Sequence, residues 1–163
     1  MGSDSDFTIM EETSKVLDQF NVPHEVLVTS AHRSPERTRK YVQGAKRRGI
    51  RVMIAGAGGA AHLAGVVAAD THLPVIGVPI ASTPLNGLDS LLSTAQMPGG
   101  IPVATVSIGK PGAKNAGLLA VQILALSDEK LAGRLIKYKK DQAKAVAQKS
   151  KKLKTSHAAN FKG

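Results

Sequence analysis

The sequence predicts an α/β fold in which helices cover both faces of an open parallel sheet. Segments typical of strands and segments typical of helices alternate along most of the chain, which is the pattern of βαβ units. The strand segment 51–55 is continuously apolar at its centre, as a parallel strand covered on both faces must be. The side chains best suited to chemistry directly follow predicted strands, where open α/β sheets bind their ligands.

The first helix is predicted from the spacing of its apolar residues. From residue 9 to residue 20 these residues recur at intervals of three and four, which places them on one helical face. Asn21 followed by Pro23 ends this helix. The next segment, 24–29, contains three consecutive apolar residues and is expected to form a strand.

The second helix begins at Pro35, because proline suits a first helical turn, and is expected to run to Gly49. After the strand at 51–55, the same criteria define the rest of the fold. The further elements are a small-residue helix at 60–69, strands at 74–78 and 103–108 separated by the segment 85–97, a buried apolar helix at 114–126, and an amphipathic helix from 128 into the 140s.

The positive charge of the chain is concentrated near its C-terminus. The net charge is +10, and residues 130–163 carry eleven Lys or Arg and one acid, so the rest is neutral. We therefore divide the 163 residues into a single α/β domain, 1–127, and a C-terminal helix with a basic tail, 128–163. The lysines at 149, 151, 152 and 154 could contact nucleic acid. A solvated helix is the favoured interpretation, because no aromatic residues alternate with these lysines.

Composition excludes several classes of protein and site. The chain has no cysteine, which excludes disulfides, thiolate metal ligands and a cysteine nucleophile and indicates the cytoplasm. No run of about 18 apolar residues predicts a membrane span, and no secretory leader is expected. The five histidines show no metal-binding spacing, and no G-x-S-x-G nucleophile motif is present.

The first of three candidate loops, Gly2-Ser3-Asp4-Ser5-Asp6, opens the first helix. Its serine hydroxyls and backbone N–H groups suit a phosphate, and a carboxylate there could accept hydrogen bonds from ribose hydroxyls. The alternative is an ordinary helix N-cap. In this kind of fold such a loop follows a central strand, and none precedes Gly2. Three explanations stay open: the protein lacks this strand, its sequence starts further upstream, or another segment fills the position of the strand.

The second loop, Ser30-Ala31-His32-Arg33-Ser34-Pro35, follows the strand at 24–29. Ser34 suits the N-cap, which leaves Ser30, His32 and Arg33 without a structural duty. Arginine binds phosphate through two parallel hydrogen bonds, and histidine is the side chain best suited to proton transfer near neutral pH. The alternative is an ordinary surface histidine.

The third loop runs from residue 55 to 62 and contains Gly56, Gly58 and Gly59 before His62. Glycine lets backbone approach a flat ligand closely, and N–H groups at a helix start favour an anion. The loop matches neither a Walker motif nor the dinucleotide fingerprint. The alternative is a tight turn that requires positive φ. Together the loops suit proton transfer on a phosphorylated small molecule.

Six motifs in order resemble one enzyme family. They are Met-Gly-Ser-Asp-Ser-Asp at 1–6, Ser-Ala-His-Arg-Ser-Pro at 30–35, Ala-Gly-Ala-Gly-Gly-Ala-Ala-His-Leu at 55–63, Pro-Val-Ile-Gly-Val-Pro at 74–79, Leu-Asn-Gly-Leu-Asp-Ser-Leu-Leu-Ser at 85–93, and Gln-Met-Pro-Gly-Gly-Ile-Pro-Val-Ala-Thr-Val at 96–106. This set resembles the class I N5-carboxyaminoimidazole ribonucleotide mutases of purine biosynthesis, which include the catalytic subunit of phosphoribosylaminoimidazole carboxylase. The resemblance covers residues 1 to about 127.

The resemblance implies a flavodoxin-like three-layer αβα sandwich with a parallel sheet, here with an extended C-terminal helix. It implies a homo-octamer with sites near subunit interfaces, a nucleotide substrate, and no metal or organic cofactor. By motif position, His32 would be the general acid and base. The implied substrate-binding residues are Ser3, Ser5, Asp6, Ser30, Arg33, Ala57, Gly58, His62 and Leu63.

Among these, Ser5, Ser30 and Arg33 would contact phosphate, and Asp6 would contact ribose. Ala57, Gly58 and Leu63 would line the pocket for the migrating carboxyl group, with Ser3 nearby and His62 at its edge. The implied reaction moves a carboxyl group from the exocyclic nitrogen of an aminoimidazole to ring carbon C4. One alternative is a carboxylase that uses free CO2 and needs the same residues. A more distant alternative is a flavodoxin-like binding module without catalytic activity.

Overall fold

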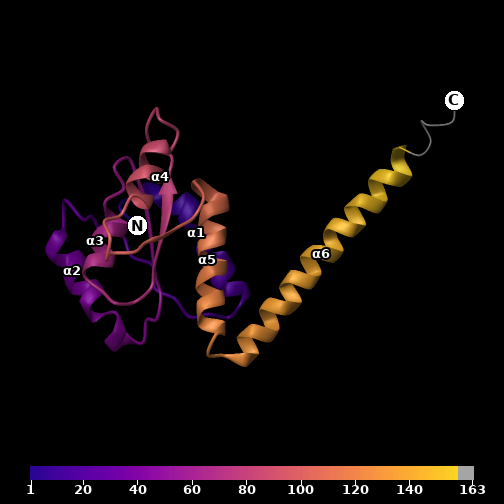
Figure 1. Ribbon diagram of the computed structural model, residues 1–163, viewed down its shortest axis with the longest axis horizontal. Coiled ribbons are helices and arrows are strands. Elements are labelled where there is room, and N and C mark those ends of the chain that lie inside the picture. Colours follow the sequence, from indigo (N-terminus) through magenta and orange to yellow (C-terminus); the bar gives the residue numbers. More distant parts are fainter. Residues whose placement is uncertain (158–163) are drawn as a thin grey trace. The chain divides into compact units, whose positions relative to one another are not determined.

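The computed structural model describes residues 1–157 and divides the chain into two compact units, Met1–Leu124 and Ala125–Gly163. The first unit contains a parallel sheet with helices on both faces (Figure 1). The predicted α/β class, with its three-layer arrangement, is therefore confirmed. Residues 158–163 of the predicted basic tail lie outside the described residues.

The sheet described by the structure has three strands in the order β1-β2-β3. They are β1 (Met53–Gly58), β2 (Val75–Ile80) and β3 (Ala104–Thr105). β2 pairs in parallel with both neighbours and is buried along its whole length. β3 is shorter than the predicted strand 103–108 because it lies at the edge and pairs only with β2.

The helices lie close to their predicted positions. They are η1 (Asp4–Asp6), α1 (Phe7–Gln19), α2 (Pro35–Gly44), η2 (Lys46–Arg48), α3 (Leu63–Ala69), α4 (Leu88–Ala95), α5 (Gly109–Ala125) and α6 (Glu129–His157). The predicted helix 35–49 is divided into α2 and η2 and ends at Gly49, which has φ +85°. α3 begins later than predicted because the glycine-rich loop extends to His62.

The two faces of the sheet are covered by different helices. α2 and α3 cover one face, and α1 and α5 lie together on the other (Figure 1). On the α2–α3 face, Val42, Leu63 and Val67 pack against Met53 of β1 in one hydrophobic cluster. On the other face, the hydroxyl of Thr13 donates to a backbone carbonyl of α5 at 2.7 Å, so that α1 is tied to α5.

Small residues in the sheet allow close packing. A Cβ added at Gly77 of β2 would lie 2.9 Å from a methyl carbon of Val103 and closer still to the methyl group of Thr94. Contacts this short force neighbouring atoms to move. Gly77 is therefore required by packing, although its φ is not positive.

The predicted strand at 24–29 does not form. These residues have no regular secondary structure, and Val26 and Val28 expose 51% and 41% of their surface. A strand is defined by hydrogen bonds to a neighbouring strand. Within the described residues the main-chain partner of this segment is Met1, whose amino group donates to Leu27 O and whose carbonyl accepts from Thr29 N–H.

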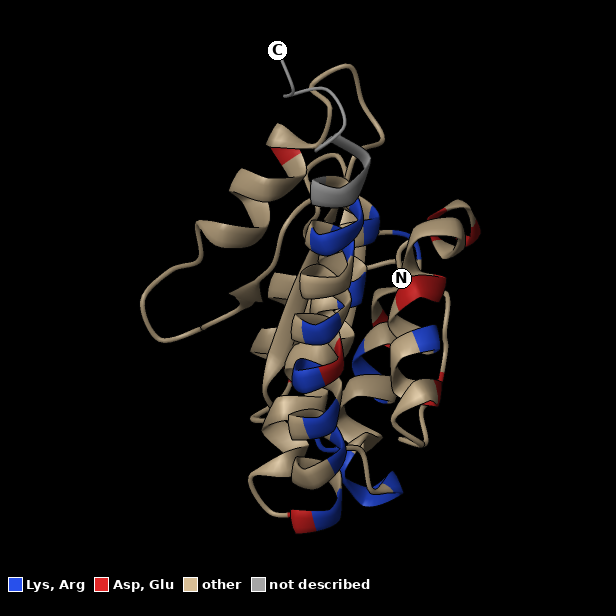
Figure 2. Cartoon of the chain, turned by 90° about the vertical axis from the view of Figure 1, so that its right-hand side faces the viewer, with Lys and Arg blue, Asp and Glu red and all other residues tan. Residues whose placement is uncertain are grey.

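The second unit is dominated by α6. This helix was predicted to run from 128 into the 140s, but it continues to His157. Lysine and alanine, which favour helix, dominate the added length. Lysine and arginine recur along α6 (Figure 2), so the excess positive charge lies on an amphipathic helix. No helix in the described part of the chain is long and apolar enough to cross a membrane.

Candidate active site at the carboxyl edge of the sheet

The three candidate loops begin at the same edge of the sheet. Met1 accepts a hydrogen bond from Thr29, and Gly2 N–H donates to Gly56 O of β1 at 3.2 Å. The first loop therefore starts between the segment 24–29 and β1, which lead into the second and third loops. These two hydrogen bonds bring the starts of the three loops together, at the edge where the prediction placed them.

The first loop is an N-cap with a capping box. Ser3 caps η1, and the Asp6 carboxylate accepts from the backbone N–H of Ser3 at 3.0 Å. The Ser5 hydroxyl donates to the Ser3 hydroxyl at 2.9 Å, and both lie near the surface. The first loop therefore does form the helix N-cap that the sequence analysis gave as the alternative to a ligand site. The two hydroxyl groups nevertheless stay at the exposed edge, where they can also contact a ligand.

Asp6 is the buried acid of the site. It exposes only 7% of its surface, and this burial raises the pKa of its carboxyl group above the ordinary value. Hydrogen bonding from Ser3 N–H and the positive charge of the Met1 amino group act in the opposite direction but are weaker. Hydrogen bonding lowers the pKa of its exposed neighbour Asp4, chiefly through the Ser3 hydroxyl.

The second loop is held by a network of hydroxyl groups. Ser30 N–H donates to Ser34 Oγ at 3.1 Å, and Ser34 Oγ in turn lies 3.1 Å from Ser30 O. The fully buried Thr38 hydroxyl lies 3.2 Å from Ser30 O and shares a 2.8 Å hydrogen bond with Thr29. These contacts fix the backbone from which His32 and Arg33 project. Sequence analysis missed Thr38, whose position one helical turn after Ser34 was the available signal.

Arg33 joins the second loop to the first. Its backbone N–H donates to Ser30 Oγ at 3.1 Å, and its Nη2 lies 3.5 Å from Gly2 O. The guanidinium is exposed and has donors left for an anion. Arg33 therefore lies beside the first loop with donors available to a phosphate.

The third loop is a tight turn. Gly59 and Ala61 have φ of +59° and +38°. The backbone of this loop is therefore the tight turn with positive φ that the sequence analysis gave as the alternative. A Cβ at Gly58 would lie 3.0 Å from Ile80 O and collide with Ser82. The close approach of Ile80 and Ser82 to residue 58 therefore requires glycine at this position. Ser82, which follows β2 at the same edge, was missed by sequence analysis.

The second and third loops meet at two histidines. Nε2 of His32 lies 2.8 Å from Nδ1 of His62, a hydrogen bond in which one ring nitrogen donates and the other accepts. The rings are perpendicular, with centroids 4.9 Å apart, and both side chains are exposed. This contact joins residues 30 positions apart, which the sequence did not predict.

Not all candidate residues present side chains at this edge. Ala57 and Gly58 are half-buried at the end of β1. Leu63 is only 4% exposed and belongs to the hydrophobic core. Among the described residues no group of His, Asp and Glu is arranged to hold a metal ion.

The fold and this edge define an α/β protein of flavodoxin-like architecture, with hydroxyl groups, an arginine, an acid and paired histidines on its strand-to-helix loops. The chain belongs to the AIR carboxylase family, whose model matches residues 1–145.

Individual members are similar over most of their length. The chain is 56% identical to the N5-carboxyaminoimidazole ribonucleotide mutases of Pyrococcus horikoshii and Bacillus subtilis, over 94% of this chain and 85% and 94% of theirs. A crystal structure of Treponema denticola PurE superposes with a TM-score of 0.84 at 29% identity, covering 94% of this chain and 95% of that one. These similarities confirm the family resemblance and the flavodoxin-like fold.

Proposed function

We propose that this protein is a mutase that converts N5-carboxyaminoimidazole ribonucleotide to 4-carboxy-5-aminoimidazole ribonucleotide in purine biosynthesis. The proposal is supported by identity above 50% to mutases over nearly the whole chain. The observation that carries it is the 2.8 Å contact between His32 and His62, because it brings a proton-transfer group to the glycine-rich loop.

The nucleotide is proposed to bind along the first and second loops. Arg33, Ser5 and Ser30 bind the phosphate, since an exposed guanidinium and hydroxyl groups are suitable donors. Asp6 accepts hydrogen bonds from the ribose hydroxyls, with Ser3 beside it. The hydrogen bonds that already hold Ser30 and Asp6 in place reduce the conformational entropy lost on binding.

His32 is proposed as the general acid and base. The C–N bond of the carbamate breaks and releases CO2, while His32 gives a proton to the exocyclic nitrogen. The electron-rich C4 then attacks the CO2, and His32 takes the C4 proton so that the ring regains aromaticity. The imidazole thus ends in its starting state, so one residue serves both steps.

The glycine-rich loop is proposed to hold CO2 between these steps. Ala57 and Gly58 approach the space with little side chain, Leu63 provides the apolar wall beneath, and His62 lies at the edge. Keeping CO2 beside C4 makes the second bond formation effectively intramolecular, an effect of several kcal/mol. These steps use no metal and no organic cofactor.

Residues 1–127 are proposed as the catalytic domain of a cytoplasmic homo-octamer, with residues 128–163 as its helix and basic tail. Leu85, Leu88 and Leu92 support self-association, because they are 60%, 52% and 49% exposed and recur at helical intervals. An apolar stripe of this kind is costly in a monomer. Light scattering should therefore give a mass of several chains, and Leu88→Lys should lower it.

The decisive experiment compares two substrates at low bicarbonate. Purified protein receives either the N5-carboxylated nucleotide or unmodified aminoimidazole ribonucleotide, and C4-carboxylated product is followed over time. Fast conversion of the carboxylated nucleotide alone supports the mutase. Product only from the unmodified nucleotide, increasing with bicarbonate, would show a carboxylase instead. No product from either would contradict both enzymes and favour a binding module.

Variants test the role of His32. His32→Asn should lower kcat by roughly 10²–10⁴, the usual contribution of general acid–base catalysis. His72→Asn is the matched control, because this exposed histidine precedes β2 and lies at the opposite edge of the sheet. Near-normal turnover by His32→Asn would exclude the proposed chemistry.

A further inference from the structure

We propose that the hydroxyl group of Ser82 is a further substrate contact, which donates a hydrogen bond to the carboxyl group while that group moves from the exocyclic nitrogen to ring carbon C4. Ser82 thereby determines how much of the CO2 is retained between the two steps. The inference rests on the proposed function, because it concerns the same site and the same reaction.

Ser82 follows β2 and lies against the third loop. The last residue of β2, Ile80, lies opposite Gly58 at the end of β1. A Cβ added at Gly58 would collide with Ser82 Oγ and would lie 2.7 Å from Ser82 Cβ. The Ser82 hydroxyl therefore occupies the space that a side chain at residue 58 would take, directly beside the glycine-rich loop that is proposed to hold CO2.

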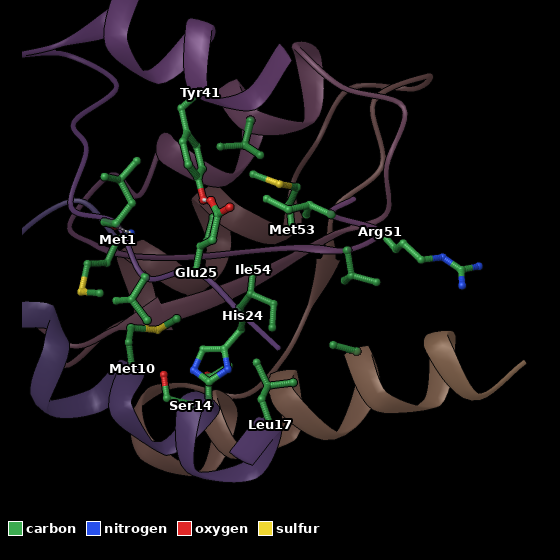
Figure 3. Close-up of a pocket in the computed structure, with 18 of the residues that line it drawn as sticks. Met1, Met10, Ser14, Leu17, His24, Glu25, Tyr41, Arg51, Met53 and Ile54 are labelled. Carbon is green, nitrogen blue, oxygen red and sulfur yellow. Dashed lines mark hydrogen bonds between the residues drawn. The ribbon is translucent and has the colours of Figure 1, made fainter. Parts of the chain in front are cut away.

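The Ser82 hydroxyl lies on the side of β1 that faces α1. Figure 3 shows the Ile54 side chain of β1 on the same side of the sheet as Met10 of α1. Gly56 has the same orientation, because an added Cβ there would collide with Met10, and Gly58 follows it in the alternation of side chains along a strand. The first loop leads directly into α1. The Ser82 hydroxyl and the first loop are therefore on the same side of β1.

The loops follow one another along the edge of the sheet in the order of the segments that carry them. Met1 accepts a hydrogen bond from the segment 24–29, and Gly2 donates one to β1. β1 in turn pairs with β2. The order is therefore second loop, first loop, third loop, and then the loop that carries Ser82. A nucleotide with its phosphate at the second loop and its ribose at the first extends toward the third, so its reacting ring and carboxyl group lie nearest to Ser82.

The loop that carries Ser82 is held in place by hydrogen bonds of its neighbours. The Thr83 hydroxyl donates to Asp89 Oδ2 at 2.7 Å, and the fully buried Ser90 hydroxyl lies 3.0 Å from Ile80 O. The Ser82 side chain itself is exposed, and within the described residues its hydroxyl has no hydrogen-bond partner. A donor that is positioned but not yet used loses little conformational entropy when it binds a ligand.

A hydroxyl donor suits the negative charge of the migrating group. When the C–N bond breaks, its electron pair passes to the exocyclic nitrogen, which takes a proton from His32, and the carboxylate becomes neutral CO2. When C4 attacks, a C–C bond forms, the negative charge returns to the oxygens and the C4 proton passes to His32. The Ser82 hydroxyl donates to one of these oxygens and keeps its own proton, so that it stabilises the charge as it develops.

The fate of the released CO2 tests the proposal. The wild type, Ser82→Ala and Ser82→Cys receive the N5-carboxylated nucleotide at low bicarbonate. Two products are measured, with the reaction without protein subtracted: the C4-carboxylated nucleotide, and unmodified aminoimidazole ribonucleotide, which forms when CO2 escapes. Both variants should increase the ratio of unmodified to C4-carboxylated product about tenfold or more, because loss of a hydrogen bond to a charged group has an effect of this size.

Two variants separate the hydrogen bond from other effects. Ser82→Cys keeps nearly the same side-chain volume, but a thiol is a weak donor. Ser93→Ala is the matched control, because the Ser93 hydroxyl donates within α4, to Ser90 O at 3.2 Å. It should keep the product ratio of the wild type.

Each outcome decides the proposal. An increased ratio in both Ser82 variants, with none in Ser93→Ala, supports it. A wild-type ratio in Ser82→Ala overturns it, and so does a wild-type ratio in Ser82→Cys alone, because volume would then be the cause. An equal increase in Ser93→Ala would show general loosening and would also overturn it. If the wild type itself forms no C4-carboxylated product, the proposed function is refuted and this inference with it.

Discussion

His62 is expected to act on the reaction through His32, and its removal gives the sharpest prediction. In the proposed mechanism, the hydrogen bond between the two histidines holds the ring of His32 in one orientation. The two nitrogens lie 2.8 Å apart on exposed side chains. Loss of one such hydrogen bond costs about 1 kcal/mol, and if this cost falls on the transition state, His62→Ala lowers kcat about fivefold.

The assay separates this role from substrate binding. Conversion of the N5-carboxylated nucleotide is measured over a range of substrate concentrations, which gives kcat and KM separately. KM should change little, because the hydrogen bond of His62 is to His32 and not to the proposed phosphate-binding residues Arg33 and Ser30. His62→Asn should recover part of the loss, since its amide places a polar atom near the position of Nδ1.

A double-mutant cycle gives the refuting result. In the His32→Asn background, His62→Ala should have no further effect, because residues that act as a unit are not additive. The reasoning would be refuted if His62→Ala kept the wild-type kcat. It would equally be refuted if the fivefold loss persisted without His32.

Three further predictions concern stability. Burial raises the pKa of the Asp6 carboxyl group in the folded state, so the contribution of Asp6 to stability is present at low pH and is lost as the pH increases from about 3.9 through the raised pKa. The free energy of unfolding of the wild type should therefore fall over this pH range relative to that of Asp6→Asn. Parallel pH profiles of the two proteins would contradict this. Gly77→Ala should lower the free energy of unfolding by about 1–3 kcal/mol in urea titrations. Gly99→Ala is the control and should change it by less than about 0.5 kcal/mol, because no atom lies within 4 Å of the added Cβ. Equal effects of the two substitutions would disprove the packing argument. Thr38→Val should lower the free energy of unfolding by about 1–3 kcal/mol, because it leaves the Thr29 hydroxyl and a backbone carbonyl without their partner. Thr38→Ser keeps the hydroxyl group and should retain most of that stability. If Thr38→Val left the free energy of unfolding unchanged, the hydroxyl network would not be what holds the second loop.

Local patterns predicted the elements that depend on nearby residues. The α1 helix was predicted from apolar spacing, and the start of α2 from Pro35. The strand at 24–29 was not predicted correctly, because a strand requires a neighbour as well as suitable residues. Its partner in the described residues is limited to Met1, so apolar content alone overestimated it.

The candidate site was predictable as a set of loops but not as a geometry. Each loop follows an apolar segment, and parallel strands align their carboxyl ends, so the sequence by itself determined which residues share one edge. The pairing of His32 with His62 and the close approach of Ser82 to Gly58 depend on distances between segments far apart in the chain. Only the tertiary structure decided these, because packing of the sheet and helices sets how closely two loops approach, and no local pattern records that distance.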